Sequence, residues 1–252
     1  MQIDAYTPGY GAGVLTFMSQ RAAETHAAFF LPQLRPGWRV LDAGCGPGTI
    51  TLGLARTVAP GQAIGIDVED SQFAAAGEKA QREALDVDFR KASVYELPFE
   101  NASFDAVFSH ALLEHLSDPV AALTEFSRVL KPRGWIGLRA PDMGGLLIDA
   151  ETDAPAEAFR AYFEKQMQNR ADPRVGRKLG RLLRAAGFTV EKLTASYEVI
   201  TEAIAKAGPS LTQPFMARAP STLASAADDA PVFIALAWCE AIGRTASAIA
   251  VT

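Results

Sequence analysis

Short apolar runs alternate with amphipathic stretches along most of the chain. Apolar runs bounded by turn residues predict β-strands at 38–43, 62–68, 87–93, 104–111, 134–140, 188–200 and 232–244. Apolar residues at helical spacing predict helices at about 13–31, 49–59, 71–84, 118–130 and 174–187. Strands that alternate with helices are typical of βαβ units and a parallel sheet. The pattern therefore predicts an α/β fold, and it leaves residues 208–229, rich in Ala, Ser and Pro, unassigned.

Composition and charge exclude several classes of protein. The 252 residues suit one large α/β domain, and 24 basic against 29 acidic residues give a net charge of -5, which disfavours nucleic acid as a partner. The sequence shows neither an apolar run of about 18 residues nor a signal peptide, so we expect a cytoplasmic protein without a membrane span. The two cysteines, Cys45 and Cys239, have no metal-ligand or disulfide spacing, so no metal is expected.

A glycine-rich loop, VLDAGCGPGT (40–49), joins the first predicted strand to the helix that follows it. Gly44 and Gly46 lack a Cβ atom, so the chain can turn tightly there and a ligand can approach the backbone. Asp67 stands about twenty residues later at the end of the second strand, where a carboxylate commonly accepts hydrogen bonds from ribose hydroxyls. A simpler explanation of the glycines is a turn needed only for packing, and a simpler explanation of Asp67 is a cap on the next helix. Together they indicate a ligand that contains adenosine.

The spacing of the glycines distinguishes two kinds of nucleoside cofactor. A dinucleotide site needs G-x-G-x-x-G, but this loop has G-x-G-x-G with Thr49 in place of the third glycine. Asp42, two residues before the first glycine, would repel a pyrophosphate and would suit a cationic ligand. S-adenosylmethionine carries both an ammonium and a sulfonium group, so the loop favours it over NAD.

Four segments in this order resemble the class I S-adenosylmethionine-dependent methyltransferases. They are VLDAGCGPGT (40–49), GIDVED (65–70), ELPFENASFDAVFSHALLEHLSDP (96–119) and RVLKPRGW (128–135). The resemblance is to the branch that includes ubiquinone and menaquinone biosynthesis enzymes and many small-molecule methyltransferases. It is strong over residues 35–140 and weak elsewhere. It implies a Rossmann-like, doubly wound sheet of seven strands, mostly parallel with an antiparallel last strand, and S-adenosylmethionine as the cofactor.

The resemblance also implies roles for individual residues. Gly44 and Gly46 would run beside the methionine part of the cofactor, and Asp42 would order the loop and the amino group. Asp67 would accept hydrogen bonds from the ribose hydroxyls, and Val68 would pack against adenine. The further cofactor contacts expected are Tyr10, Cys45, Ser93, Val94, Ser109 and His110.

Ser93 departs from the family pattern. The third strand commonly ends in an acid that accepts a hydrogen bond from the adenine amino group, and here that position is a serine. A hydroxyl can accept the same bond without a charge. Adenine recognition would then depend more on the backbone at Ser93 and Val94 and on apolar contacts.

His110 is the candidate catalytic residue, because it follows the fourth strand where cofactor and acceptor should meet. It could line the pocket or act as a general base, and we favour the lining role, since in-line transfer needs orientation more than deprotonation. His115 is expected to pack or cap beneath this loop. Glu114 is expected to be a solvated acid at the start of a helix, with orientation of a histidine as the alternative. His26 has no motif around it.

Substrate contacts are expected outside the cofactor half. Pro141, Asp142 and Met143 follow the fifth strand on the same rim, where they could line a pocket or simply form a loop. The N-terminal segment carries Tyr6 and Tyr10 among turn residues, a composition that suits a mobile flap, with a disordered tail as the alternative.

We therefore predict a methyltransferase that acts on a small organic acceptor by in-line displacement. A single domain is expected over 1–252, with a flap and helix at 1–35, a cofactor-binding core at 36–140, and substrate-side segments and the last strands at 141–252. The alternatives are a nicotinamide- or flavin-dependent oxidoreductase, an RNA or protein methyltransferase, and a binding protein without catalysis.

Overall fold

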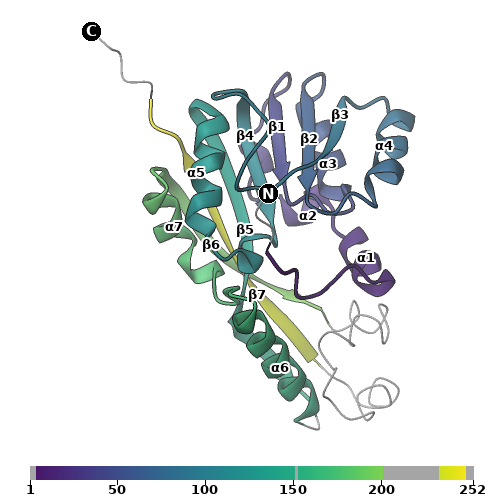
Figure 1. Ribbon diagram of the computed structural model, residues 1–252, viewed down its shortest axis with the longest axis vertical. Coiled ribbons are helices and arrows are strands. Elements are labelled where there is room, and N and C mark those ends of the chain that lie inside the picture. The colour runs from purple at the N-terminus through teal and green to yellow at the C-terminus, as the bar shows by residue number, and fades with distance from the viewer. Residues whose placement is uncertain (1–3, 151–152, 201–232, 248–252) are drawn as a thin grey trace.

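The computed structural model describes residues 4–150, 153–200 and 233–247, which are built around one seven-stranded sheet (Figure 1). The strands lie in the order β3-β2-β1-β4-β5-β7-β6. Their bounds are β1 Arg39–Ala43, β2 Gln62–Asp67, β3 Val87–Lys91, β4 Phe104–His110, β5 Leu130–Asp149, β6 Thr189–Val199 and β7 Phe233–Arg244. Strands β1 to β5 pair in parallel, whereas β7 is antiparallel to both β5 and β6. The predicted α/β fold with an antiparallel last strand is confirmed, and residues 208–229 lie outside the described part of the chain.

Helices cover both faces of the sheet. Their bounds are α1 Ala12–Ser19, α2 Ala23–His26, α3 Thr49–Val58, α4 Phe73–Arg82, α5 Pro119–Val129, α6 Ala154–Gln168 and α7 Leu179–Ala185, with short 3-10 turns η1 Leu31–Gln33, η2 Leu113–His115 and η3 Gly176–Lys178. Residues of α5 and α7 pack with Leu41 and Val107 in a core on one face. Residues of α2 and α3 pack with Val40 and Phe108 on the other. Because successive strand residues point to opposite faces, β1 and β4 supply apolar side chains to both cores.

The parallel register brings the ends of several strands to one edge of the sheet. In β1, Asp42 pairs with Gly65 of β2 and with Phe108 of β4. The glycine loop after β1 therefore lies beside Asp67 and His110, which end the two neighbouring strands. Ligands of open α/β sheets bind outside the carboxyl ends of the strands. The fold thus places the predicted cofactor residues at the edge where a site is expected.

The prediction of one helix over 13–31 is wrong. The chain forms α1 and α2, separated at residues 20–22, where Ala22 is extended with a φ of -138°. The break lets α2 pack closely on α3, since a methyl group added at Gly53 would lie 2.4 Å from Cβ of Ala23. Tertiary packing therefore overrides the helical pattern of this segment.

The C-terminal half differs from the prediction at two elements. Strand β5 continues to Asp149 because β7 pairs with it on both sides of an irregularity between Asp142 and Leu147. Helix α6 was not predicted, and its buried Gln166 interrupts the apolar stripe that would have revealed it. Figure 1 shows α6 beside the lower ends of β5 and β7. The helix predicted over 174–187 is present as η3 followed by α7.

Gly137 of β5 provides a test of packing in the second core. A methyl group added there would lie 2.4 Å from the buried ring of Phe30. We expect Gly137→Ala to lower the free energy of unfolding by about 1–3 kcal/mol, because overpacking strains a filled core. Urea unfolding measures the change. Gly77 of α4 is the control: nothing lies within 4 Å of its added methyl group, so Gly77→Ala should raise stability by up to about 1 kcal/mol. Equal stability of the two variants would contradict the packing argument.

Candidate active site

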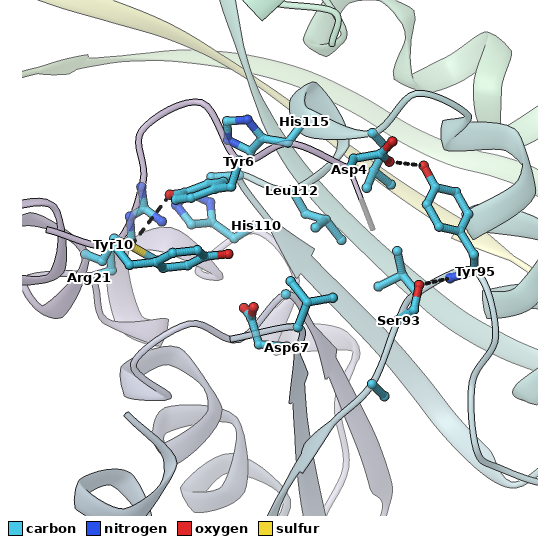
Figure 2. A pocket seen from close by; sticks show the side chains of 17 residues that line it. Asp4, Tyr6, Tyr10, Arg21, Asp67, Ser93, Tyr95, His110, Leu112 and His115 are labelled. Atoms are coloured by element: carbon cyan, nitrogen blue, oxygen red, sulfur yellow. Dashed lines mark hydrogen bonds between the residues drawn. The ribbon is translucent and has the colours of Figure 1, made fainter. Parts of the chain in front are cut away.

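A cavity of about 720 Å³, open mouth included, lies at the carboxyl ends of β1 to β4 (Figure 2). A smaller chamber of about 270 Å³ lies beside it at the glycine loop. The residues that line both spaces are Met18, Arg21, Gly44 and His110. The larger and the smaller chamber therefore meet at these four residues.

The glycine loop folds back onto the end of β2. The amides of Gly44 and Cys45 both donate to the carbonyl oxygen of Ile66, at 2.9 Å. Gly44 has a φ of +77°, which glycine adopts without strain, and an added methyl group would lie 3.0 Å from Leu112. Gly44 lines both chambers and Cys45 lines the smaller one. The loop thus brings bare backbone against the cavity, as predicted.

Asp67 lines the larger chamber at the end of β2. Its carboxylate accepts hydrogen bonds from the amides of Gly46 at 2.9 Å and Glu69 at 3.1 Å. Burial raises the pKa of Asp67, and the hydrogen bonds from these amides oppose the rise. The two bonds fix the carboxylate, while each oxygen keeps a lone pair for a ligand hydroxyl. Gly46 lines neither chamber, so its role is to hold Asp67 in place.

Asp42 lies beneath the loop in the wall of the smaller chamber. It is only 2% exposed and accepts a hydrogen bond from the hydroxyl of Thr51 at 2.6 Å. Burial raises the pKa of Asp42 to about 7; the Thr51 hydrogen bond opposes this rise, and the charge of Asp67 adds to it. A cation in this chamber would favour the ionised carboxylate. The predicted contact of Asp42 with the amino group of the cofactor stays a prediction, and a cation there would be needed to keep the carboxyl ionised.

The opposite side of the larger chamber is mainly apolar. Val68, Ala92 and Val94 line it, together with Ser93, whose hydroxyl accepts a hydrogen bond from the amide of Tyr95 at 3.3 Å. In Figure 2, Ser93 lies across the cavity from Arg21. The predicted adenine contacts Val68, Ser93 and Val94 thus line one side of the larger chamber, and their contact with adenine stays a prediction.

Arg21 is a cavity residue that the sequence did not reveal. It lies at the break between α1 and α2 and lines both chambers. Its guanidinium carbon lies 5.6 Å from the ring centroid of Phe17, and it makes no ion pair with any described residue. No motif surrounds it in the sequence, and only the break between two helices turns it toward the cavity. Arg21 supplies a cation where the two chambers meet.

The N-terminal segment crosses the mouth of the cavity. The carboxylate of Asp4 accepts hydrogen bonds from the hydroxyl of Tyr95 and the amide of Ser117. The rings of Tyr6 and Tyr10 stack with their centroids 4.9 Å apart, and both line the larger chamber (Figure 2). The segment thus lies where the predicted flap would cover a ligand, and its opening stays a prediction.

His110 stands at the end of β4, where the chambers meet. The residue is 4% exposed, and neither ring nitrogen has a hydrogen-bond partner. Burial, followed by the nearby cations Arg21 and Arg139 and then by His26, holds the pKa of His110 well below its usual 6.5. At neutral pH a neutral imidazole with two unpaired nitrogens therefore faces the cavity.

Beside the cavity, η2 carries a second histidine and a buried acid. His115 lines the larger chamber, and the centroid of its ring lies 4.7 Å from that of Tyr6, edge to face. Burial lowers the pKa of His115 to about 3 and raises that of Glu114 to about 7. The expectation that Glu114 is solvated is wrong, because η2 packs inward and leaves the residue only 3% exposed.

Several predicted site residues lie away from both chambers. Ser109 is buried and donates to the carbonyl oxygen of Ala43 at 2.9 Å, which ties β4 to β1. Pro141, Asp142 and Met143 belong to β5, which continues past the predicted rim, and Asp142 forms an ion pair with Arg177. These residues line neither of the two chambers, and their predicted contacts with cofactor or substrate stay predictions.

Comparison with known proteins assigns the central part of the chain to a family. Residues 41–138 match the family described as "Methyltransferase domain". An uncharacterised methyltransferase of Schizosaccharomyces pombe is 37% identical over 145 residues, which are 53% of this chain and 52% of that protein. A demethylmenaquinone methyltransferase of Lactococcus lactis is 33% identical over 138 residues, 52% of this chain and 50% of the relative. The chain spans about half the length of these curated relatives.

Solved structures share the fold. The YcgJ protein from Bacillus subtilis has a TM-score of 0.62 at 18% identity, over 89% of this chain and 99% of its own. The cyclase SpnF has a TM-score of 0.54 at 25% identity, over 94% of this chain and 81% of its own. The family match, the relatives and the glycine loop agree. Residues 41–138 are therefore similar to methyltransferase domains, and the glycine loop lies within this matched segment.

Proposed function

We propose that the protein transfers a methyl group from S-adenosylmethionine to a small organic acceptor. The observation that carries the proposal is the set of charges in the two chambers. Asp67 lines only the larger chamber, whereas Arg21 and the bare backbone at Gly44 line both. This cofactor carries a ribose, a sulfonium and an α-amino acid, and the chambers offer a carboxylate, bare backbone and a guanidinium that suit these three groups. The relatives named as methyltransferases support the same assignment.

The residues of the cavity divide between the parts of the cofactor. Asp67 would hold the ribose hydroxyls, and Val68 and Ser93 would enclose adenine. In the smaller chamber Asp42 would face the ammonium group, and Arg21 would bind the carboxylate in a charge-assisted pair. Four residues line both chambers, so the reactive sulfonium would lie among them, beside His110.

Positioning accounts for most of the expected catalysis. When bound, S-adenosylmethionine supplies an electrophilic methyl group, whose bond to sulfur breaks as its bond to the acceptor atom forms. The flap residues Tyr6 and Tyr10 would exclude water, which would otherwise compete as the acceptor. His110 would orient the acceptor through an unpaired ring nitrogen rather than remove its proton, because an imidazole of lowered pKa is a weak base.

Features outside the cofactor site remain predictions. We propose a single domain, since β6 and β7 complete the sheet that β1 to β5 begin. None of the helices in the described ranges has the length and apolarity needed to cross a bilayer. Cytoplasmic location stays a prediction, and so does the absence of a nucleic-acid partner, which is based on the net charge of -5.

A screen of acceptors with isotope-labelled S-adenosylmethionine tests the function directly. Phenols, catechols, hydroxy acids and amines cover oxygen and nitrogen acceptors, and calorimetry with S-adenosylhomocysteine and NAD tests the cofactor separately. We expect S-adenosylhomocysteine to bind and NAD not to bind. A reaction without methyl transfer, such as the cyclisation named for SpnF, would leave the label in the cofactor. Binding of NAD alone would favour the oxidoreductase.

Asp67→Ala should weaken binding of S-adenosylhomocysteine by at least about tenfold, because each lost charge-assisted hydrogen bond is worth about 1.5–3 kcal/mol. Calorimetry measures the affinity. The control is Asp70→Ala, an acid three positions away whose carboxylate pairs with Lys91 on the surface, at 3.1 Å. Equal affinities for the two variants would remove Asp67 from the ribose site.

Arg21→Met should weaken binding of S-adenosylhomocysteine by roughly tenfold to a hundredfold, because the amino-acid carboxylate loses its charged partner. Methylthioadenosine, which lacks the amino-acid end, should bind the variant and the wild type equally. Isothermal titration of both ligands separates loss of this contact from a general disturbance. A parallel loss for both ligands would show that Arg21 only supports the fold.

The pH dependence of turnover tests the state of His110. Its pKa lies well below 6.5, so protonation is displaced to lower pH and the imidazole stays neutral as pH falls through 6.5. We therefore expect the rate profile of the wild type to parallel that of His110→Gln between about pH 6 and 8. An acid limb near pH 6.5 that the variant lacks would instead identify His110 as a general base.

A further inference from the structure

His110 belongs to a closed ring of five side chains behind the cavity. Its imidazole stacks on Trp238 of β7, with centroids 4.8 Å apart and an interplanar angle of 27°. The guanidinium of Arg139 lies 4.1 Å from the ring centroid of Trp238 and donates to Glu198 of β6 at 3.1 Å. Glu198 also lies 3.7 Å from Nε2 of His26, whose ring meets the face of His110 edge-on at 5.1 Å. The five side chains come from α2, β4, β5, β6 and β7.

His110 depends on this ring for its orientation. Neither of its nitrogens has a hydrogen-bond partner, so no hydrogen bond holds the imidazole plane. Stacking on Trp238 and the edge of His26 limit its rotation instead. Arg139 in turn lies against Trp238, where a cation is attracted to the face of an aromatic ring.

Glu198 joins the two ends of the ring. One carboxylate oxygen meets Arg139 and the other faces His26, so this side chain links the strand that carries Arg139 to the helix that carries His26. Burial alone would raise the pKa of Glu198, but His26 and Arg139 outweigh it and lower the pKa to about 2. The bridge is therefore ionised throughout the neutral range.

We propose that Glu198 is a positioning residue, which bridges Arg139 and His26 and so holds the ring of His110 aimed at the point where the two chambers meet. The role of Glu198 in catalysis rests on the proposed function, because the methyl group would lie where the two chambers meet only if the protein transfers a methyl group. The bridge itself does not depend on the reaction. Removing it would leave Arg139 without its shortest ion pair and Nε2 of His26 without its carboxylate partner, so that only the contacts of Nδ1 with Ala22 and Thr25 would hold the His26 ring.

Glu240 is the matched control within the same network. Its carboxylate lies 3.6 Å from Nε of Arg139 and accepts hydrogen bonds from Thr194 at 2.7 Å and Ser196 at 3.2 Å. Unlike Glu198, it makes no contact with His26 within the described structure. Glu240→Gln therefore removes a charge beside Arg139 and keeps the bridge between Arg139 and His26.

The experiment records imidazole signals of the protein labelled with nitrogen-15 histidine and saturated with S-adenosylhomocysteine. The chain has three histidines, His26, His110 and His115, so each can be assigned by substitution. In Glu198→Gln we expect the ring nitrogens of His110 and His26 to shift or broaden. The signals of His115, which lies outside the ring, should be unchanged. In Glu240→Gln the signals of all three histidines should be unchanged. The affinity for S-adenosylhomocysteine should change less than about twofold, since Glu198 does not line the cofactor cavity.

Two results would overturn the proposal. One is a His110 signal in Glu198→Gln that coincides with the wild type. The other is an equal shift of His115, which would indicate general loosening. Glu198→Asp, which keeps the charge on a shorter side chain, replaces the glutamine variant if that variant fails to fold, and it should give a smaller His110 shift in the same direction. If the wild type does not bind S-adenosylhomocysteine, the proposed function is refuted, whereas the proposed bridge between Arg139 and His26 is not affected.

Discussion

The parallel pairing of β1 with β2 on one side and β4 on the other is the constraint on which the site depends. Both faces of β1 are buried, and a shift of register by one residue would exchange its two sets of apolar side chains. The register therefore places the ends of three strands side by side. Asp67 can then reach the amide of Gly46, and this bond joins the end of β2 to the loop after β1. The geometry of the cavity thus follows from the burial of one short strand.

Burial also decides the charges in the cavity. The carboxyl of Asp42 has its pKa raised by desolvation, and the imidazoles of His110 and His115 have theirs lowered by it. The low dielectric therefore pushes all three toward their neutral forms. A cationic ligand beside the loop would reverse this for Asp42 and would leave the histidines neutral. In the proposed function Asp42 would therefore account for the preference for a cation, and the neutral histidines would be able to hydrogen-bond an uncharged acceptor.

The parts predictable from the sequence are those encoded by local spacing. The alternation of strands and helices predicted the sheet. The sequence also predicted that three residues lie together at its edge, namely Gly44 in the loop, Asp67 and His110. The N-terminal helix was mispredicted because close packing of Ala23 on Gly53 breaks a pattern that locally favours one helix. Arg21 was missed for the same reason, since its approach to the cavity depends on that break.

The acceptor side illustrates why the rest could not be predicted. Strand β7 inserts between β5 and β6, and this antiparallel insertion brings Trp238 directly behind His110. No local spacing predicts such a contact, because the two residues lie on strands far apart in sequence and the ring between them carries no motif. Arg139 and Glu198 complete the ring, and nothing in the sequence around them distinguishes them from other polar residues of predicted strands. The proposed cofactor residues therefore lie in one continuous half of the chain, whereas the ring of side chains around His110 also needs β6 and β7, which complete the sheet.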